Sequence, residues 1–398
     1  MKAFLRQEMI EATRLTQAGR LSEATAVIQA LLGGGLDAAS EPTRGASIAL
    51  PPPQLELKAL NGDVSARAGP SPPTFPATGK MSFALKGLVL PNLPGRKAPS
   101  RSEIAPSAGQ YISATISGAA GPHTYKLYIP SRLGGGPRPL IVMLHGCTQS
   151  ADDFAAGTRM NFAAEGSGCF VLYPEQSLTA NPQKCWNWFK PADQQRGRGE
   201  PALIAAMTRH VMRSHPIDAG RVYVAGLSAG GAAAAIMGEA YPDLFAAVGV
   251  HSGLACGAAR DLPSAFTAMR GSGPASTAPR SESRTATPTI VFHGDQDKTV
   301  HPRNGAEVIA RASVEGHWES VSAKGGAQGR KYTRSVLRDR SGQIVLEKWE
   351  IHGGGHAWSG GSRAGSYTDP AGPDATAHML KFFLDHKMLS AKGTGSKS

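Results

Sequence analysis

The chain has 398 residues, of which 41% are hydrophobic, and its formal net charge at pH 7 is +12. That length is sufficient for one large α/β domain or two ordinary domains. The basic residues are dispersed, with no run of about five or six like charges, so the pattern argues against a nucleic-acid-binding protein. No stretch reaches the roughly 18 apolar residues that span a bilayer, so we expect no transmembrane segment.

Residues 1–35 are predicted to form a short helical segment. Apolar residues recur at helical spacing through "AGRLSEATAVIQALL", and three glycines, Gly33 to Gly35, end the pattern. A small helical hairpin of this kind could dock on a granule surface or on a protein partner. Because the segment lacks an apolar run of signal-peptide length, we expect a cytoplasmic protein, with an extracellular location as the alternative.

Three further stretches have the composition of linkers. Residues 36–109 are rich in Pro, Ala, Ser and Gly, and we expect them to form a largely disordered linker. Residues 271–288 are expected to be a flexible insertion, and residues 389–398 a disordered tail. The range 110–388 is therefore the predicted α/β domain.

Within that domain, strand and helix patterns alternate along the chain. The predicted strands are 139–146, 169–175, 221–228, 245–253, 289–297 and 344–353. The predicted helices are 199–214, 230–242 and 374–387. The first five strands are near-continuous apolar runs, which are typical of buried parallel strands. The alternation predicts a doubly wound, mostly parallel sheet that binds its ligands beyond the carboxyl ends of the strands.

Ser228 stands in the stretch "GLSAG", directly after a predicted strand and before a predicted helix. Gly226 and Gly230 flank it, where a sharp turn leaves no room for side chains. This context is that of a nucleophile elbow, and a packing turn of small residues is the alternative. A serine hydroxyl becomes a good nucleophile only when a base takes its proton, and the base needs an orienting acid.

The acid and the base of such a site follow the serine in the chain. The segment "HGDQD" offers Asp295 and Asp297, and the segment "IHGGGHAW" offers His352 and His356. We predict His356 as the base, because its glycine-rich loop can reach across the site, and His352 as structural. We predict Asp297 as the acid, because it lies deeper in its loop. Asp295 is then expected to bind backbone N–H groups of the turn.

The developing oxyanion needs hydrogen-bond donors in the transition state. The backbone N–H of Ala229, directly after the nucleophile, is the first candidate donor. The second is the N–H of Cys147, which follows "HG" at the end of an early strand. An ordinary tight turn is the alternative explanation of this "HG" pair.

Three tryptophans stand near these motifs: Trp186, Trp188 and Trp358. We expect them to line an acyl or aryl subsite, and core packing with a partner for the indole N–H is the alternative. No histidine or aspartate cluster has metal-ligand spacing, so we expect neither a metal nor another cofactor. The four cysteines are too few for a disulfide scaffold, although one disulfide is possible and would conflict with a reducing compartment.

Five motifs across residues 110–388 together resemble the polyhydroxybutyrate depolymerase-type esterases, which are α/β hydrolases related to feruloyl and acetylxylan esterases. They are "LIVMLHGCTQSADDF", "CWNWF", "RVYVAGLSAGG", "HGDQDKTV" and "GGGHAWSGG", in this order. The resemblance implies Ser228 as nucleophile, Asp297 as acid, His356 as base, and an oxyanion hole that includes the N–H of Cys147. It also implies a disulfide between Cys147 and Cys185, because relatives commonly bond the cysteine of this loop.

The leading hypothesis is a serine carboxylic ester hydrolase that acts through an acyl-enzyme. Its expected substrates are poly(3-hydroxybutyrate), oligomers of that polymer, or other short-chain esters. A feruloyl- or acetylxylan-type esterase, or a related peptidase, is the alternative enzyme. A protein that binds a granule or partner surface through residues 1–35 is the alternative from another class.

Overall fold

The computed structural model describes most of the predicted α/β domain. The described residues are 98–118, 121–273, 287–313, 317–324 and 329–388. In these ranges, no helix is both long and apolar enough to cross a membrane.

The structure corrects the predicted end of the linker. Residues 98–109 are part of the folded body, since they contain the helix α3 (Arg101–Ile104). The Ile104 side chain is buried, and Asn161 Nδ2 donates a 2.9 Å hydrogen bond to the Ile104 carbonyl. A four-residue helix is too short to show a periodic pattern, so composition alone could not identify it. The predictions for 1–35 and 389–398, and most of those for 36–109 and 271–288, lie outside the described residues.

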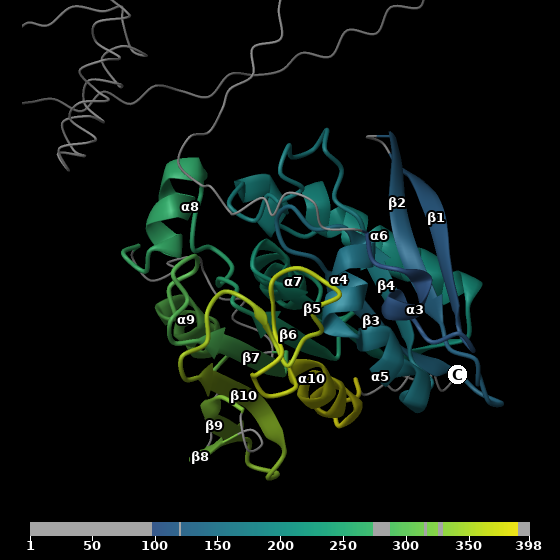
Figure 1. Cartoon of the computed structure of the whole chain (residues 1–398). Helices are drawn as coiled ribbons and strands as arrows, with labels where there is room; N and C mark the ends of the chain where they lie inside the picture. The colour runs from purple at the N-terminus through teal and green to yellow at the C-terminus, as the bar shows by residue number, and fades with distance from the viewer. Residues whose placement is uncertain (1–97, 119–120, 274–286, 314–316, 325–328, 389–398) are drawn as a thin grey trace, which may run out of the picture. The chain divides into compact units, whose positions relative to one another are not determined.

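A ten-stranded sheet runs through the described domain in the order β1-β2-β4-β3-β5-β6-β7-β10-β9-β8 (Figure 1). Its strands are β1 (Gln110–Gly118), β2 (Gly121–Ile129), β3 (Arg138–Leu144), β4 (Phe170–Pro174), β5 (Ile217–Leu227), β6 (Ala247–His251), β7 (Thr289–Gly294), β8 (His317–Lys324), β9 (Lys331–Arg338) and β10 (Ile344–Ile351). The strands from β4 to β10 in this order are parallel, and antiparallel pairs flank them on both sides. The predicted doubly wound, mostly parallel sheet is confirmed.

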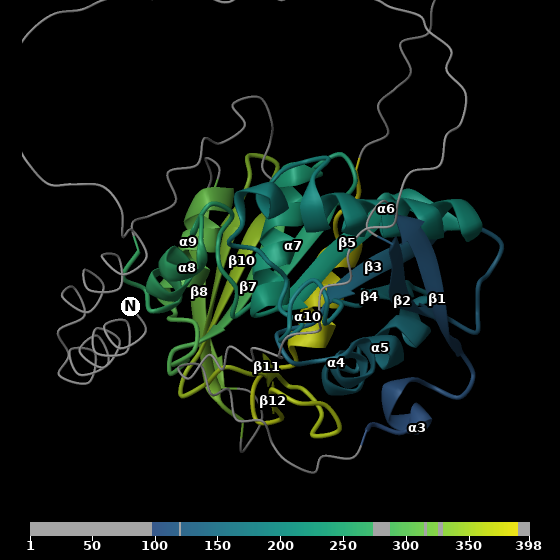
Figure 2. The same cartoon turned by 90° about the horizontal axis from the view of Figure 1, so that it is seen from above.

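Helices cover both faces of the sheet (Figure 2). One face packs against α6 (Gly199–Ser214), α7 (Ala229–Ala240), α8 (Leu262–Met269) and α9 (Arg303–Ala312). The other face packs against α3, α4 (Ala151–Thr158), α5 (Met160–Ser167) and α10 (Ala375–Leu384). Alternate residues of each strand point to opposite faces, so Leu140 and Val142 belong to one core while Ile141 and Met143 belong to the other. This two-sided burial explains the continuous apolar runs of the central strands.

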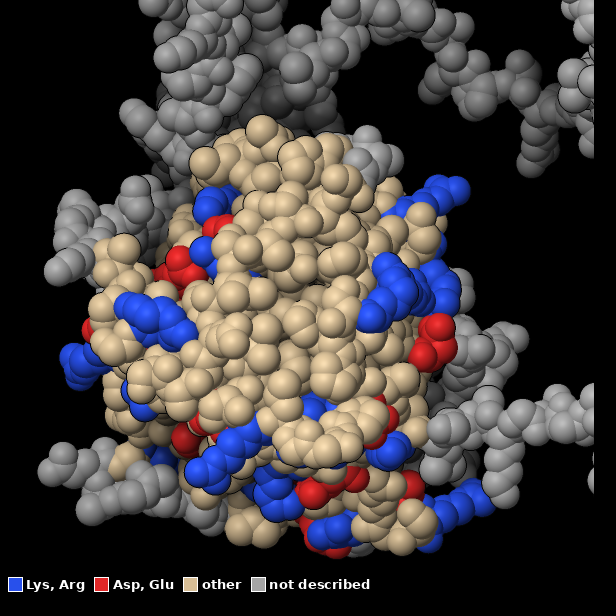
Figure 3. Space-filling model, turned by 90° about the vertical axis from the view of Figure 1, so that its right-hand side faces the viewer, with Lys and Arg blue, Asp and Glu red and all other residues tan. Residues whose placement is uncertain are grey.

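Charged residues are scattered over the face of the molecule in Figure 3. Uncharged residues cover its centre, while Lys and Arg stand toward the margins with Asp and Glu among them. Several basic side chains elsewhere pair with acidic neighbours, as Arg196 does with Asp243 and Arg334 with Glu347. On this face, basic and acidic residues are therefore interspersed rather than gathered in one basic patch.

Candidate active site

Ser228 occupies a strained turn between β5 and α7. Its backbone has φ 57° and ψ −120°, a region that costs a non-glycine residue about 1–3 kcal/mol. A Cβ added to Gly230 would lie 2.0 Å from the Leu144 carbonyl oxygen, and one added to Gly226 would lie 2.3 Å from the Gly230 backbone. Because backbone atoms cannot move away at either position, only glycine fits on both sides of the serine. The Ser228 N–H donates a 2.9 Å hydrogen bond to the His251 carbonyl, which fixes the turn.

His356 and Asp297 form a close pair at the ends of β10 and β7. His356 Nδ1 donates a 2.7 Å hydrogen bond to Asp297 Oδ2. The backbone N–H groups of Thr299 and Val300 each donate a 2.9 Å hydrogen bond to Asp297 Oδ1. Burial raises the pKa of Asp297, but hydrogen bonds from His293 and His356 outweigh burial and hold this pKa well below its usual range. Asp297 is therefore ionised, and it accepts the hydrogen bond from His356 in that form.

The other aspartate and histidine of these loops form a separate pair. Asp295 Oδ2 accepts a 3.1 Å hydrogen bond from His352 Nδ1, and Asp295 Oδ1 accepts a 2.7 Å hydrogen bond from the Gly353 N–H. Asp295 thus binds the backbone of the turn, as expected from the sequence. The structure joins Asp297 with His356 and Asp295 with His352, so the two alternatives for the acid lie in different environments.

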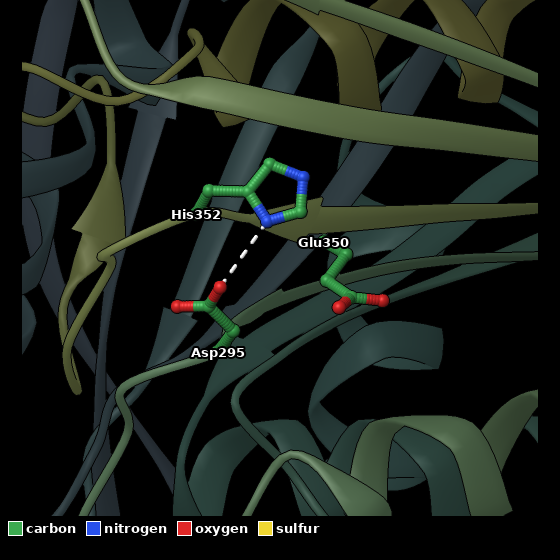
Figure 4. Close-up of side chains that lie close together, drawn as sticks. All are labelled: Asp295, Glu350 and His352. Atoms are coloured by element: carbon green, nitrogen blue, oxygen red, sulfur yellow. Dashed lines mark hydrogen bonds and ion pairs between the residues drawn. The ribbon is translucent and has the colours of Figure 1, made fainter.

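Glu350 lies beside the Asp295–His352 pair (Figure 4). One ligand atom from each of these three side chains lies within 4.8 Å of the others, a spacing that could hold a metal ion. Every one of the three also has a protein partner: His352 Nε2 lies 2.9 Å from Thr333 Oγ1, and Glu350 Oε2 lies 3.2 Å from Lys348 Nζ. Hydrogen bonds and an ion pair therefore account for this cluster without a cation.

His251 connects the serine turn with the loop that carries His356. The His251 carbonyl accepts the Ser228 N–H, and His251 Nε2 accepts a 3.0 Å hydrogen bond from the Ser359 N–H. Burial lowers the pKa of His251 to about 3, so the ring stays neutral and can accept this bond. No hydrogen bond joins the Ser228 hydroxyl to His356 in the described chain. Such bonds often tighten only when substrate is present.

The expected oxyanion donors lie beside Ser228. Within the described chain, neither the Cys147 N–H nor the Ala229 N–H donates a hydrogen bond to another residue. By contrast, the Gly146 N–H donates a 2.9 Å hydrogen bond to Gln149 Oε1. A Cβ on Gly146 would lie 3.6 Å from the Cβ of Ser228, so this loop passes next to the serine. The N–H groups of Cys147 and Ala229 thus make no hydrogen bond within the described chain, as the oxyanion-donor hypothesis requires.

A disulfide joins Cys147 to Cys185 across 38 residues of sequence. It connects the loop after β3 with the segment that carries Trp186. The other two cysteines, Cys169 and Cys256, are buried thiols, and burial raises the pKa of each to about 12. These two side chains therefore remain protonated at physiological pH, which makes them poor nucleophiles.

The three tryptophans lie in the core rather than on the surface of a subsite. Trp186 and Trp358 are each 1% exposed, and Trp188 is 6% exposed. Trp186 Nε1 donates a 3.0 Å hydrogen bond to the His145 carbonyl, and Trp358 Nε1 donates one of 3.0 Å to Thr376 Oγ1. With so little exposed ring area, these indoles offer no face to a substrate. Trp186 and Trp358 match core packing with a partner for the indole N–H, and Trp188 is buried in the same way without a hydrogen bond from its indole N–H in the described chain.

Four residues that sequence analysis did not single out also lie at the site: Gln149, Asp153, His251 and Tyr367. The Tyr367 hydroxyl lies 3.2 Å from Thr148 Oγ1, and its ring lies edge-on to the His356 ring at 6.5 Å between centroids. Tyr367 also has a positive φ of 50°, which is unusual for a bulky residue. The "HS" pair at 251–252, near the end of the predicted strand 245–253, was a sequence signal for His251.

The strand order, the strained serine turn and the aspartate and histidine that follow it along the chain define an α/β hydrolase. The solved structure of an acetyl xylan esterase from Aspergillus awamori supports the same fold. It aligns with 70% of this chain and 100% of its own, with a TM-score of 0.54 and 21% identity.

The family profile described as Esterase PHB depolymerase matches residues 123–333. A poly(3-hydroxyalkanoate) depolymerase C from Paucimonas lemoignei is 30% identical over 296 residues, which cover 66% of this chain and 69% of that protein. A feruloyl esterase B from Neurospora crassa is 32% identical over 235 residues, which cover 54% of this chain and 77% of that protein. The chain belongs to the esterase PHB depolymerase family, as the resemblance predicted, and is a carboxylic ester hydrolase.

Proposed function

We propose that Ser228, His356 and Asp297 hydrolyse esters through an acyl-enzyme. The observation that carries this proposal is the 2.7 Å hydrogen bond between His356 Nδ1 and Asp297 Oδ2. It places the imidazole proton on Nδ1 and leaves Nε2 as the proton acceptor, which is the tautomer that a general base needs. The strained turn at Ser228 supports the proposal, because nucleophile elbows hold their serine in this way.

In acylation, His356 Nε2 takes the hydroxyl proton while Ser228 Oγ attacks the ester carbonyl carbon. The N–H groups of Cys147 and Ala229 donate to the oxyanion of the tetrahedral intermediate. When the intermediate collapses, the carbon–oxygen bond to the alcohol breaks, and His356 gives its proton to the departing alcohol. Water then attacks the acyl-enzyme with the same proton transfers, which releases the acid and restores the serine hydroxyl.

The proposed substrates are esters of 3-hydroxybutyrate, as oligomers or polymer, and other short-chain esters. The 30% identity over two thirds of a poly(3-hydroxyalkanoate) depolymerase supports this choice. A feruloyl- or acetylxylan-type activity is the second candidate, favoured by the 32% identity to a feruloyl esterase. Values of kcat/KM for 3-hydroxybutyrate trimer, methyl ferulate and acetylated xylan, measured side by side, distinguish the two.

Labelling with a fluorophosphonate, followed by peptide mapping, tests the mechanism. We expect one adduct on Ser228, no adduct after heat denaturation, and neither label nor turnover in Ser228→Ala. A folded protein that takes up no label, or a Ser228→Ala variant that keeps its turnover, would exclude Ser228 as the nucleophile.

We also propose an oxidising compartment for the protein, and so the extracellular alternative. The disulfide between Cys147 and Cys185 supports it, because such bonds are rare in the reducing cytosol. Alkylation of the denatured protein from its own cells with N-ethylmaleimide should modify only Cys169 and Cys256. Modification of all four cysteines would point to the cytoplasm instead.

A further inference from the structure

The segment of residues 146–149, here called the oxyanion loop, is held by a buried glutamine. Gln149 is 2% exposed, and its Oε1 accepts the 2.9 Å hydrogen bond from the Gly146 N–H. A Cβ on Gly146 would lie 3.1 Å from this Oε1 and 3.6 Å from the Cβ of Ser228. The glutamine amide therefore lies directly behind the loop that faces the nucleophile.

The other end of the same amide reaches across to a distant part of the chain. Gln149 Nε2 donates a 2.8 Å hydrogen bond to Asp153 Oδ2, and it lies 3.2 Å from Ser366 Oγ and 3.3 Å from the Ser366 carbonyl. The amide orientation is unambiguous, because the reverse orientation would place its NH₂ against the Gly146 N–H and its oxygen against a carboxylate. One side chain thus satisfies a donor on the oxyanion loop and acceptors outside it.

Asp153 completes the connection to the loop that follows His356. Its carboxylate accepts hydrogen bonds from the Ser366 N–H at 2.9 Å and from Ser366 Oγ at 2.5 Å. Asp153 is itself placed in the first turn of α4, where its N–H donates to Ser150 Oγ at 3.1 Å. The next residue, Tyr367, reaches Thr148 through its hydroxyl. Two parallel links therefore join the oxyanion loop to the loop of the base.

This arrangement has a consequence for the oxyanion donors. The Gly146 N–H already donates its hydrogen bond to Gln149, so it cannot donate to a substrate. The next N–H along the chain, that of Cys147, has no such bond and can donate to a substrate. Donors stabilise an oxyanion best when they are fixed before the reaction, because no reorganisation is then needed in the transition state. Removing one donor of this kind costs about 10²- to 10³-fold in kcat, and loosening one costs less.

We propose that Gln149 is a positioning residue, which fixes the oxyanion loop against the loop of His356 through Asp153 and Ser366. The inference rests on the proposed function of Ser228 and Cys147. It assigns Gln149 no contact with substrate. Its effect is therefore on stabilisation of the transition state, with little effect on binding of the ground state.

The variant Gln149→Met tests this role, because it keeps a similar volume and removes both hydrogen-bonding ends. The matched control is Asn161→Leu. Asn161 is also a buried amide with two hydrogen bonds, to the Ile104 carbonyl and from the Tyr173 hydroxyl, but it lies on α5. Both variants should unfold at a lower temperature than the unmodified protein.

For Gln149→Met we expect kcat on p-nitrophenyl acetate to fall by about 10- to 100-fold, with KM changed less than about 3-fold. Inhibition by phenylboronic acid, which forms a tetrahedral anion on serine, should weaken by a similar factor. Asn161→Leu should keep kcat within about twofold. A Gln149→Met variant with the kcat and boronate affinity of the control would overturn the inference.

Fluorophosphonate labelling separates this failure from failure of the proposed function. If the unmodified protein is labelled at Ser228 and Gln149→Met is labelled at the same rate, the positioning role is wrong and the nucleophile stands. If the unmodified protein is not labelled at Ser228, the proposed function is wrong, and the role of Gln149 is wrong with it.

Discussion

Replacement of Asp297 by asparagine should abolish most of the activity while leaving the shape of the site unchanged. In the structure, Asp297 Oδ2 accepts the proton of His356 Nδ1, while Asp297 Oδ1 is held by two backbone N–H groups. Asparagine would keep its oxygen on those two donors and would turn its NH₂ toward His356. The imidazole would then have to present a lone pair at Nδ1 and carry its proton on Nε2, where it could not accept the proton of Ser228.

The loss should be about 10⁴-fold in kcat, which is about 5.5 kcal/mol of transition-state stabilisation, because the asparagine enforces the wrong tautomer. The assay is kcat on p-nitrophenyl acetate near pH 8. Asp295→Asn is the matched control: Asp295 pairs with His352 and the Gly353 N–H, so its replacement should change kcat less than about threefold. Equal losses in both variants, or a larger loss in Asp295→Asn, would refute the assignment of the acid.

Three further predictions concern stability. Gly230→Ala should prevent the native turn and remove activity, because its Cβ would lie 2.0 Å from a carbonyl oxygen. Gly166→Ala is the matched control, since a Cβ at this position on α5 meets no other atom within 4 Å. In a urea titration of both variants, Gly166→Ala should raise the unfolding free energy by about 0.5–1 kcal/mol. Reducing the disulfide, or replacing Cys185 by serine, should lower the unfolding free energy by about 4 kcal/mol, as estimated for a 38-residue loop and measured in urea with and without reductant. Burial and then Asp193 raise the pKa of Glu200 to about 7, so its contribution to stability is complete below about pH 4.5 and is lost as the pH rises to 7. The loss of unfolding free energy over this range is about 3 kcal/mol. Glu200→Gln should therefore reduce the change of melting temperature with pH between pH 5 and 8. An unchanged dependence of the melting temperature on pH would contradict the assignment.

The features that sequence analysis predicted are those encoded by neighbouring residues. The central strands were recognisable because burial on both faces requires unbroken apolar runs, and the turn at Ser228 because glycines must flank it within a few residues. The outer strands β1, β2, β8 and β9 were missed. β1 alternates exposed polar residues such as Ser113 and Thr115 with partly buried ones, so it carries little apolar signal.

The features that sequence analysis missed depend on contacts between distant residues. Gln149 and Ser366 are separated by 217 residues, and Thr148 and Tyr367 by 219, so no local pattern could join them. The burial of the three tryptophans also depends on contacts that the local sequence does not show. Each tryptophan lies near a motif in the sequence, but tertiary packing determines the direction of its ring. Trp358, for example, is buried and stacks on His251.

The burial of Trp186 next to Cys185 gives the protein an internal optical signal. Because Trp186 directly follows Cys185 in the chain, reduction of the Cys147–Cys185 bond should change the fluorescence intensity of Trp186 before the chain unfolds. Unfolding exposes the same ring to water and shifts its emission to longer wavelength. Measured against the Cys185→Ser variant, which removes the disulfide and keeps all five tryptophans, the intensity would report the chemical state of this loop, and the wavelength would report the integrity of the core.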